Sequence, residues 1–253
     1  MRYNHQMTKM ILRHIAFAAI IMLAINAGAQ NNDKILNRPY ADAKTFHYGF
    51  SVGMNFQNLN IANNGLVTED GESWFADIPD NSPGFCVNVL ADMRLSDQLN
   101  LRVSPGMYFG NKVVKWRNAN FNPEVQDPTR SMQSQNIKAT YVVVPVDVKY
   151  SALRYQNMRP YFTGGVMALY DVGKERPEHL RLKDVDVMLT LGLGCDFYLP
   201  FFKLCPELKF CFGLRDILQR DRPDLEDNPE MMRFTESVKK VQNNMVVLTF
   251  YFE

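Results

Sequence analysis

The stretch FHYGFSVGMNFQ, residues 46–57, alternates between two unlike sets of side chains. One parity carries Phe, Tyr, Phe, Val, Met and Phe, whereas the other carries His, Gly, Ser, Gly, Asn and Gln. Successive side chains of a β-strand point to opposite faces of the sheet. A period of two sustained over a dozen residues therefore predicts a strand with one apolar and one polar face.

The same alternation returns seven more times, in the stretches 85–94, 99–109, 141–150, 161–170, 187–197, 204–215 and 245–252. One parity of each stretch is nearly free of charge, and the other is rich in Gly, Ser, Thr and Asn. Lipid-facing and lumen-facing residues alternate in this way in membrane barrels, whose strands need about 9–11 residues to cross the bilayer. We therefore predict an all-β fold, an eight-stranded antiparallel transmembrane β-barrel of the outer-membrane type. A soluble β-sandwich or a lipocalin-like barrel, with the apolar parity inside, is the alternative fold.

Connection lengths favour the membrane barrel. Short links at 96–98, 154–157 and 200–203 alternate with long links at 59–82, 112–137, 172–184 and 216–241. Outer-membrane barrels have short periplasmic turns at one rim and long outer loops at the other. This layout places both chain ends in the periplasm.

The N-terminus has the pattern of an export signal. Arg2, Lys9 and Arg13 precede an apolar run at 15–25, and small residues at 27–29 suit a signal peptidase. The apolar run is shorter than the roughly 20 residues of a membrane-spanning helix, and an uncleaved anchor helix is the alternative. We expect a signal peptide at 1–29, a periplasmic segment at 30–44 and the barrel at 45–253.

Charge balance argues against nucleic acid as a partner. The whole chain has 28 basic and 27 acidic residues, and removal of the three basic residues of the leader leaves 25 against 27, a net charge of −2. A nucleic-acid-binding domain normally carries a clear basic excess. The expected partner is instead the lipid bilayer of the outer membrane.

The four cysteines, Cys86, Cys195, Cys205 and Cys211, all fall within predicted strands. Cys205 and Cys211 would stand roughly 20 Å apart along one strand at about 3.3 Å per residue. We therefore expect free, packed thiols, and leave open a pair formed by Cys86 across the barrel.

The polar parity also carries charges of both signs. An eight-stranded barrel has an interior just wide enough for side chains to fill, and buried charges need partners. We therefore predict a structural network of paired lumen charges that plugs the barrel, formed by Asp92, Arg94, Arg102, Asp147, Lys149, Asp196, Glu207, Lys209 and Arg215. An ion-conducting pore is the less favoured alternative at this strand number.

Catalytic patterns are weak. His47 and Ser51 share a face but stand roughly 13 Å apart along the strand, beyond hydrogen-bond reach. His179 lies among glutamates in a long link, where a solvated loop is commoner than a metal site. We expect no catalytic residue, cofactor or metal, and therefore no enzyme.

The last long link contains helix signals. Asn228 suits an N-cap, Pro229 suits the first helical position, and Lys239 and Lys240 suit the far end. Its apolar residues would dock on the barrel rim or on a partner, and are Met231, Met232, Phe234 and Val238.

The segment NRPYADAKTFHYGFSVGMN, residues 37–55, resembles the start of PorT-type proteins. In that family an Asn-x-Pro, an aspartate–lysine pair and then His-aromatic-Gly-Phe-x-x-Gly-x-Asn open the first strand. LRVSPG at 101–106 and FYFE at 250–253 are similar too. The likeness runs over essentially the whole mature chain, and its first motif is the specific one. The cysteine-containing seventh strand departs from the family pattern.

This resemblance implies a non-enzymatic component of the type IX secretion system, which exports proteins that carry a C-terminal sorting domain. It also implies other secretion-apparatus proteins as partners, and the family supplies no catalytic residues to carry over. Two other functional classes stay open. One is an adhesion or structural barrel that binds ligands through its outer loops, and the other is an outer-membrane enzyme that modifies lipid or peptide.

Overall fold

The computed structural model describes residues 35–65, 73–77, 80–120, 131–173, 180–222 and 229–253. Within these ranges, Asn37–Glu253 form one compact unit. The predicted signal peptide at 1–29 lies outside the described residues. The description below concerns the unit Asn37–Glu253.

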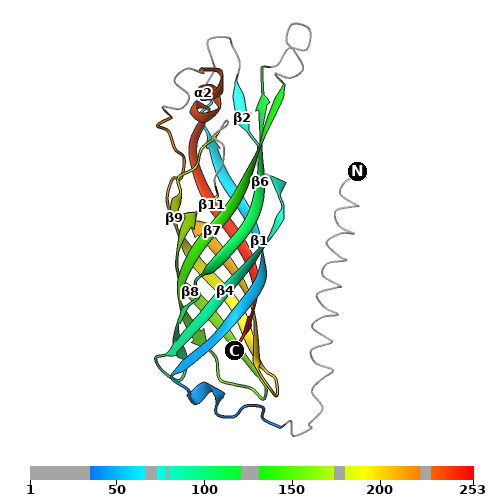
Figure 1. Ribbon diagram of the computed structural model, residues 1–253, viewed down its shortest axis with the longest axis vertical. Coiled ribbons are helices and arrows are strands. Elements are labelled where there is room, and N and C mark those ends of the chain that lie inside the picture. Colours follow the sequence, from blue (N-terminus) through cyan, green and yellow to red (C-terminus); the bar gives the residue numbers. More distant parts are fainter. Residues whose placement is uncertain (1–34, 66–72, 78–79, 121–130, 174–179, 223–228) are drawn as a thin grey trace, which may run out of the picture. The chain divides into compact units, whose positions relative to one another are not determined.

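The described residues of this unit form antiparallel strands and two short helices. The elements in chain order are η1 (Ala41–Ala43), β1 (Phe46–Asn63), β2 (Trp74–Ala76), β3 (Asp80–Asn81), β4 (Pro83–Arg94), β5 (Leu99–Val103), β6 (Gly106–Asn118), β7 (Met132–Ser151), β8 (Met158–Asp171), β9 (Val185–Tyr198), β10 (Lys203–Gly213), α2 (Pro229–Glu236) and β11 (Val238–Phe252). Figure 1 shows the strands winding around a common axis.

The described strands close into a ring of eight positions, because β1 pairs with both β4 and β11. The third position is shared by β5 and β6, which both pair with β7. Pro105 separates them, since its ring nitrogen has no hydrogen to donate to a ladder. The predicted eight-stranded barrel is confirmed.

The predicted apolar parity faces outward. On β1 the side chains Phe46, Tyr48, Phe50, Val52, Met54 and Phe56 are 40–71% exposed. The intervening Ser51, Asn55 and Gln57 are fully buried. A contiguous exposed apolar surface of this kind suits lipid and not water. The lipocalin-like alternative, with its apolar parity inside, is therefore wrong.

The strands run beyond this apolar belt, and their polarity inverts there. On β1 the outward residues after Phe56 are Asn58 and Asn60, whereas the inward Leu59 is buried. On β7 the outward Lys138 precedes the apolar run, and the inward Ile137 is buried. The period of two continues, but water now lies outside and apolar side chains must pack inward.

The long links are consequently shorter than predicted. Residues assigned to links at 59–82, 112–137 and 216–241 instead extend β1 to Asn63, β6 to Asn118, β7 back to Met132 and β11 back to Val238. Two further short strands, β2 and β3, pair with the extended β6. These segments form what we call the loop-end extension.

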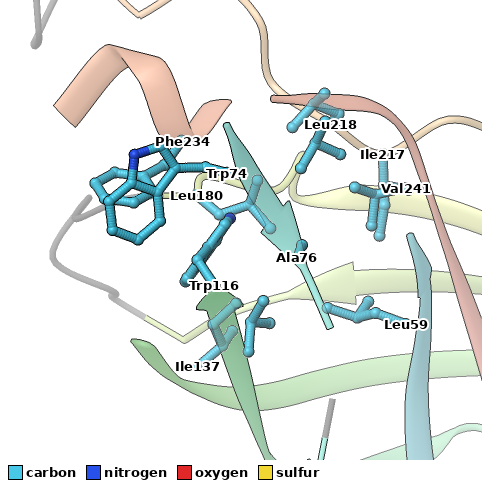
Figure 2. Close-up of a cluster of buried hydrophobic side chains, with 12 residues drawn as sticks. Leu59, Trp74, Ala76, Trp116, Ile137, Leu180, Ile217, Leu218, Phe234 and Val241 are labelled. Atoms are coloured by element: carbon cyan, nitrogen blue, oxygen red, sulfur yellow. The ribbon is translucent and has the colours of Figure 1, made fainter. Parts of the chain in front are cut away.

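Buried apolar side chains fill the loop-end extension, as Figure 2 shows. Phe234 of α2 lies edge-on to Trp74 and Trp116, with ring centroids 4.9 Å and 5.6 Å apart. Aromatic pairs of this kind contribute about 0.5–1.5 kcal/mol each beyond their buried area. The cluster consists of Leu59, Trp74, Ala76, Val114, Trp116, Ile137, Leu180, Ile217, Leu218, Phe234, Val238 and Val241.

The helix predicted in the last link is α2, although its end differs from the prediction. It finishes at Glu236, and Lys239 and Lys240 belong to β11. Asn228, the predicted N-cap, lies outside the described residues. Among the described residues, no helix is long and apolar enough to cross a membrane.

All four cysteines lie in described strands and carry free thiols. Cys86, Cys205 and Cys211 are buried, and Cys195 is partly exposed. The barrel is therefore held by its hydrogen-bonded ladders and packed interior without a disulfide among the described residues.

Candidate functional site

The interior near the short turns is occupied by charged side chains centred on Arg102. Its guanidinium is fully buried and contacts three carboxylates: Nε lies 3.0 Å from Asp92, Nη1 lies 3.1 Å from Glu207, and Nη2 lies 3.2 Å from Glu253. The planar fork of arginine suits several simultaneous carboxylate contacts. Arg102 thus joins β5 to β4, to β10 and to the residue after β11.

Two lysine-centred groups extend these contacts. Lys149 Nζ donates to both carboxylate oxygens of Asp196, at 2.9 and 2.7 Å. Lys209 Nζ lies 2.6 Å from Asp147 and 3.1 Å from Glu207. The Thr190 hydroxyl donates to the second oxygen of Asp147 at 2.5 Å.

Lys203 links the Lys149–Asp196 pair to the contacts of Arg102, because it lies 3.9 Å from Asp196 and forms an ion pair with Glu253. Glu207 joins the Lys209 group to Arg102. We call the connected residues the lumen charge cluster: Asp92, Arg102, Asp147, Lys149, Asp196, Lys203, Glu207, Lys209 and Glu253. Among the described residues it therefore has four basic and five acidic members. Buried charges at this density are tolerated only when partners are close and well oriented.

Strand register brings the first of these partners together. Arg102 stands directly opposite Asp92 of β4 on one side and Asp147 of β7 on the other. Opposite charges at facing positions of neighbouring strands attract one another. The contacts to Glu207 and Glu253 cross the lumen instead, so they depend on closure of the ring.

Aromatic rings complete the surroundings of the cations. The guanidinium carbon of Arg102 lies 4.7 Å from the Tyr251 ring centroid, and Lys149 Nζ lies 4.1 Å from that of Tyr161. Such contacts stabilise a desolvated cation by about 2 kcal/mol. Tyr161 approaches β9 at Gly194, where a Cβ would come within 2.3 Å of the Tyr161 ring. Any larger residue at that position would have to displace the Tyr161 ring.

Seven of the nine predicted lumen charges belong to the cluster, and two do not. Arg94 lies at the short-turn rim, where it contacts Asp97 and donates to the Ala43 carbonyl at 3.3 Å. Arg215 follows β10 at the opposite end and is exposed. Both lie near strand ends, where the lumen face meets water.

The prediction missed Lys203 and Glu253. Lys203 was assigned to a turn, but it is the first residue of β10 and is buried. Glu253 follows Phe252, and the alternation along β11 carries its side chain inward after Tyr251. Extending the period of two by one residue would have found Glu253.

A segment before β1 closes the short-turn end of the barrel. Residues 37–44, which we call the N-terminal strap, lie beneath this rim in Figure 1. The backbone N–H of Asn37 donates to Asn157 Oδ1 at 2.9 Å, and its side chain donates to the Tyr198 carbonyl at 3.0 Å. Arg154 donates to the carbonyls of Asn37 and Arg38 while its guanidinium stacks 3.6 Å from the Tyr198 ring centroid.

The strap also contacts the end of the last strand. Arg38 Nη1 donates to the backbone oxygen of Glu253 at 3.0 Å. Asp42 accepts a hydrogen bond from the Tyr198 hydroxyl at 2.6 Å and lies 3.6 Å from Arg159. The strap thus joins the β7–β8 turn, the end of β9 and the end of β11.

Little space remains inside this end of the barrel. The cavity between the strap and the charge cluster has a volume of about 10 Å³, which is room for about one water molecule. Its lining includes Asp42, His47, Lys149, Asp196 and Lys203. Further along the axis, buried Tyr, Met, Cys and aliphatic side chains fill the interior. Among the described residues, side chains thus fill the interior at both of these levels.

The weak catalytic candidates are not assembled. His47 Nδ1 lies 3.8 Å from Glu253, whereas the Ser51 hydroxyl accepts a hydrogen bond from Asn88. His179 lies outside the described residues. Within the described ranges, no group of three or more His, Cys, Asp or Glu side chains is placed to hold a metal ion.

Comparison with solved structures finds small outer-membrane barrels at low identity. Neisserial surface protein A is 9% identical, with a TM-score of 0.39. The alignment covers 82% of this chain and 98% of the chain of that protein. OprG from Pseudomonas aeruginosa is 12% identical, with a TM-score of 0.44, and the alignment covers 81% of this chain and 93% of the OprG chain. The outer membrane protein AlkL is 12% identical, with a TM-score of 0.37, and the alignment covers 86% of this chain and 95% of the AlkL chain. Likeness at this level says nothing about function.

Comparison with curated protein sequences finds no match. Residues 29–219 match the family described as outer membrane protein beta-barrel domain. The match stops before α2 and β11, and β11 closes the ring by pairing with β1 and β10. With three-quarters of its length matched, and with a closed barrel that carries an outward apolar belt, the chain belongs to the outer membrane protein beta-barrel domain family.

Proposed function

We propose that this outer-membrane barrel is a non-enzymatic component of a type IX protein secretion apparatus and supports export of sorting-domain cargo. The likeness of residues 37–55 to the opening motif of PorT-type proteins suggests the system. The structural observation that carries the non-conducting role is the closed interior, filled by the lumen charge cluster and the apolar side chains beyond it. Such a barrel does not conduct cargo and acts through its surfaces.

Within this proposal, the first residues of the PorT-like segment form the N-terminal strap and hold the short-turn rim in a defined shape. Asn37, Arg38 and Asp42 belong to the PorT-like segment, and each contacts the short-turn rim. This rim faces the periplasm in the proposed orientation, together with the strap and the end of β11. The partners are other proteins of the secretion apparatus, which would meet a rim of defined shape.

The orientation is testable on intact cells. A short epitope inserted in the β9–β10 turn at 199–202 should be hidden from antibody until the outer membrane is opened. The same epitope in the link after β10, near Gln219, should be detected on intact cells. The reverse labelling pattern would overturn the orientation.

Deletion of the gene tests the secretion role. Cargo with a sorting domain should then accumulate in the periplasm, and the intact gene supplied in trans should restore export. A variant that breaks the charge cluster should fail to restore export only if its barrel is lost from the membrane. Normal surface display of cargo in the deletion strain would refute the secretion role.

A ligand-binding or adhesion barrel is the second candidate. The observation that favours it is the loop-end extension, which carries ordered strands and α2 beyond the apolar belt. In this case deletion should leave cargo export intact and reduce attachment of cells to their ligand.

A further inference from the structure

The side chain of His47 is enclosed at the short-turn end, beneath the N-terminal strap. His47 is the second residue of β1, and its side chain is only 10% exposed. It lines the cavity of about 10 Å³ between the strap and the lumen charge cluster, and Asp42 of the strap lines the same cavity. Water therefore has little access to the imidazole while the strap is in place.

The charged groups that surround His47 are already paired with one another. Among the described residues they come from the strap, from strands β4, β5, β7, β8, β9 and β10, from the β4–β5 turn and from the residue after β11. Five carboxylates face five cations, in the ion pairs Asp42–Arg159, Asp92–Arg102, Asp97–Arg94, Asp196–Lys149 and Glu253–Lys203. The longest of these contacts, that of Asp42, is 3.6 Å. The charges around the ring thus balance without His47.

A proton on His47 would consequently find no free counter-charge. Asp92, directly opposite on β4, contacts Arg102 at 3.0 Å. Glu253 Oε2 lies 3.8 Å from His47 Nδ1, which is longer than a hydrogen bond. Glu253 also pairs with Lys203 and accepts from Arg102 at 3.2 Å. An imidazolium would have to share this carboxylate with two other cations, with almost no water to solvate it, and such a buried charge is costly.

Removal of the strap would relieve this cost. The strap is held by a few polar contacts, from Arg38 to the backbone oxygen of Glu253 and from Asp42 to Tyr198 and Arg159. Asp42 precedes His47 by five residues, so displacement of the strap opens the chain directly above the ring. Water could then enter and hydrate a charged imidazole.

We propose that His47 makes the N-terminal strap a pH-sensitive closure of the short-turn rim. The strap closes over the neutral imidazole and opens when the imidazole takes up a proton from solvent. Because the closed form disfavours the proton, closure is complete above the range in which a free imidazole titrates, near pH 6.5, and is lost as the pH falls through that range. Opening uncovers the ends of β9 and β11, which the strap contacts.

Hydrogen exchange of the purified full-length barrel in detergent tests this closure. Protection of residues 37–44, corrected for the intrinsic effect of pH on exchange, should fall about tenfold between about pH 7.5 and about pH 5.5, the protonation ratio of an imidazole that titrates near pH 6.5. His47→Gln, whose side chain stays neutral, should keep the same protection at both pH values. The matched control is His179→Gln, which removes the other histidine after residue 29 and should behave like the wild type.

The possible results lead to different conclusions. Unchanged protection of the wild type at about pH 5.5 would overturn the pH-sensitive closure. An equal loss of protection in His47→Gln, or no loss in His179→Gln, would overturn the role of His47. Carboxylates such as Asp42 ordinarily titrate near pH 4, so they contribute little at about pH 5.5.

Nuclear magnetic resonance of labelled histidine rings in the wild-type barrel gives a measurement that needs no variant. The His47 ring should gain its proton over the pH range in which the strap loses protection, and a ring already protonated beneath a protected strap would contradict the proposal. Heat-modifiable migration shows whether the barrel of each variant is intact. Because these measurements use the purified protein, failure of the secretion proposal leaves them unchanged.

Discussion

Arg102 shows how a single buried cation can organise the interior of a barrel. It contacts Asp92, Glu207 and Glu253, and the rings of Tyr161 and Tyr251 lie over its guanidinium. Three carboxylates would repel one another in its absence, and water has almost no room to replace it. The residue therefore stabilises the cluster chiefly by preventing unpaired negative charge.

We predict that Arg102→Met lowers the free energy of unfolding by about 3–5 kcal/mol, the usual cost of leaving buried charges unpaired. Urea titration of the barrel folded into lipid vesicles measures this loss. Arg215→Met is the control, because Arg215 is exposed outside the cluster, and its effect should stay within about 0.5 kcal/mol. Equal stabilities for the two variants would show that the cluster does not depend on Arg102.

At the level of elements, the N-terminal strap lies across the short-turn end of the barrel and connects several of its strands. It has little regular structure beyond η1, and its position follows from side-chain contacts to Asn157, Tyr198 and Glu253. Arg38 adopts a positive φ of 49°, a conformation that costs about 1 kcal/mol or more for a residue other than glycine. The contacts around it maintain that conformation.

Asp42→Ala should loosen the strap without unfolding the barrel. The change removes the carboxylate that accepts from Tyr198 and pairs with Arg159, a loss of about 1–3 kcal/mol in local stability. Hydrogen exchange at residues 37–44 should speed up roughly 5- to 150-fold as a result. Tyr40→Ala serves as control because Tyr40 is 81% exposed. Unchanged hydrogen exchange in Asp42→Ala would show that the contacts of Asp42 do not hold the strap against the barrel.

The polarity change along β1 makes a second prediction at this scale. Val52 and Asn60 share the outward parity, but Val52 lies within the apolar belt and Asn60 beyond it. Val52→Arg should lower the free energy of unfolding in vesicles by about 2–4 kcal/mol, whereas Asn60→Arg should change it by about 0–1 kcal/mol. Equal costs at the two positions would place the membrane boundary elsewhere.

At the scale of the whole barrel, the interior is filled in three levels. The charge cluster lies at the short-turn end, a mixed layer with Tyr108, Tyr141 and Met188 lies next, and the tryptophan-containing cluster lies in the loop-end extension. An eight-stranded ring has little more space than these side chains need. The architecture therefore favours a scaffold over a channel.

Purified barrel reconstituted in planar bilayers should consequently carry no ion current above that of the bare membrane. A general porin reconstituted in parallel would show that insertion and recording work. Stable conductance steps from this barrel would contradict a packed lumen. Such steps would also remove the structural support for a non-conducting role in secretion.

The amino-acid sequence alone determined the eight strand segments that cross the apolar belt, their two faces and the alternation of short and long links. These follow from local rules, because side chains alternate with a period of two and lipid selects the outward set. The same rules also predict β1 and β7 beyond the apolar belt, provided that apolar side chains are expected to face inward there and polar side chains outward. Seven of the predicted lumen charges meet for the same reason, since strand parity already points them inward.

Only the tertiary structure decided which charges pair, why Glu253 belongs with Arg102, and how residues 37–44 cover the short-turn rim. Glu207 and Glu253 reach Arg102 across a lumen that exists only after β11 has paired with β1. Asn37 and Tyr198 are 161 residues apart in the chain. Contacts of this kind depend on register and ring closure, which are collective properties of all eight positions and leave no local pattern to read.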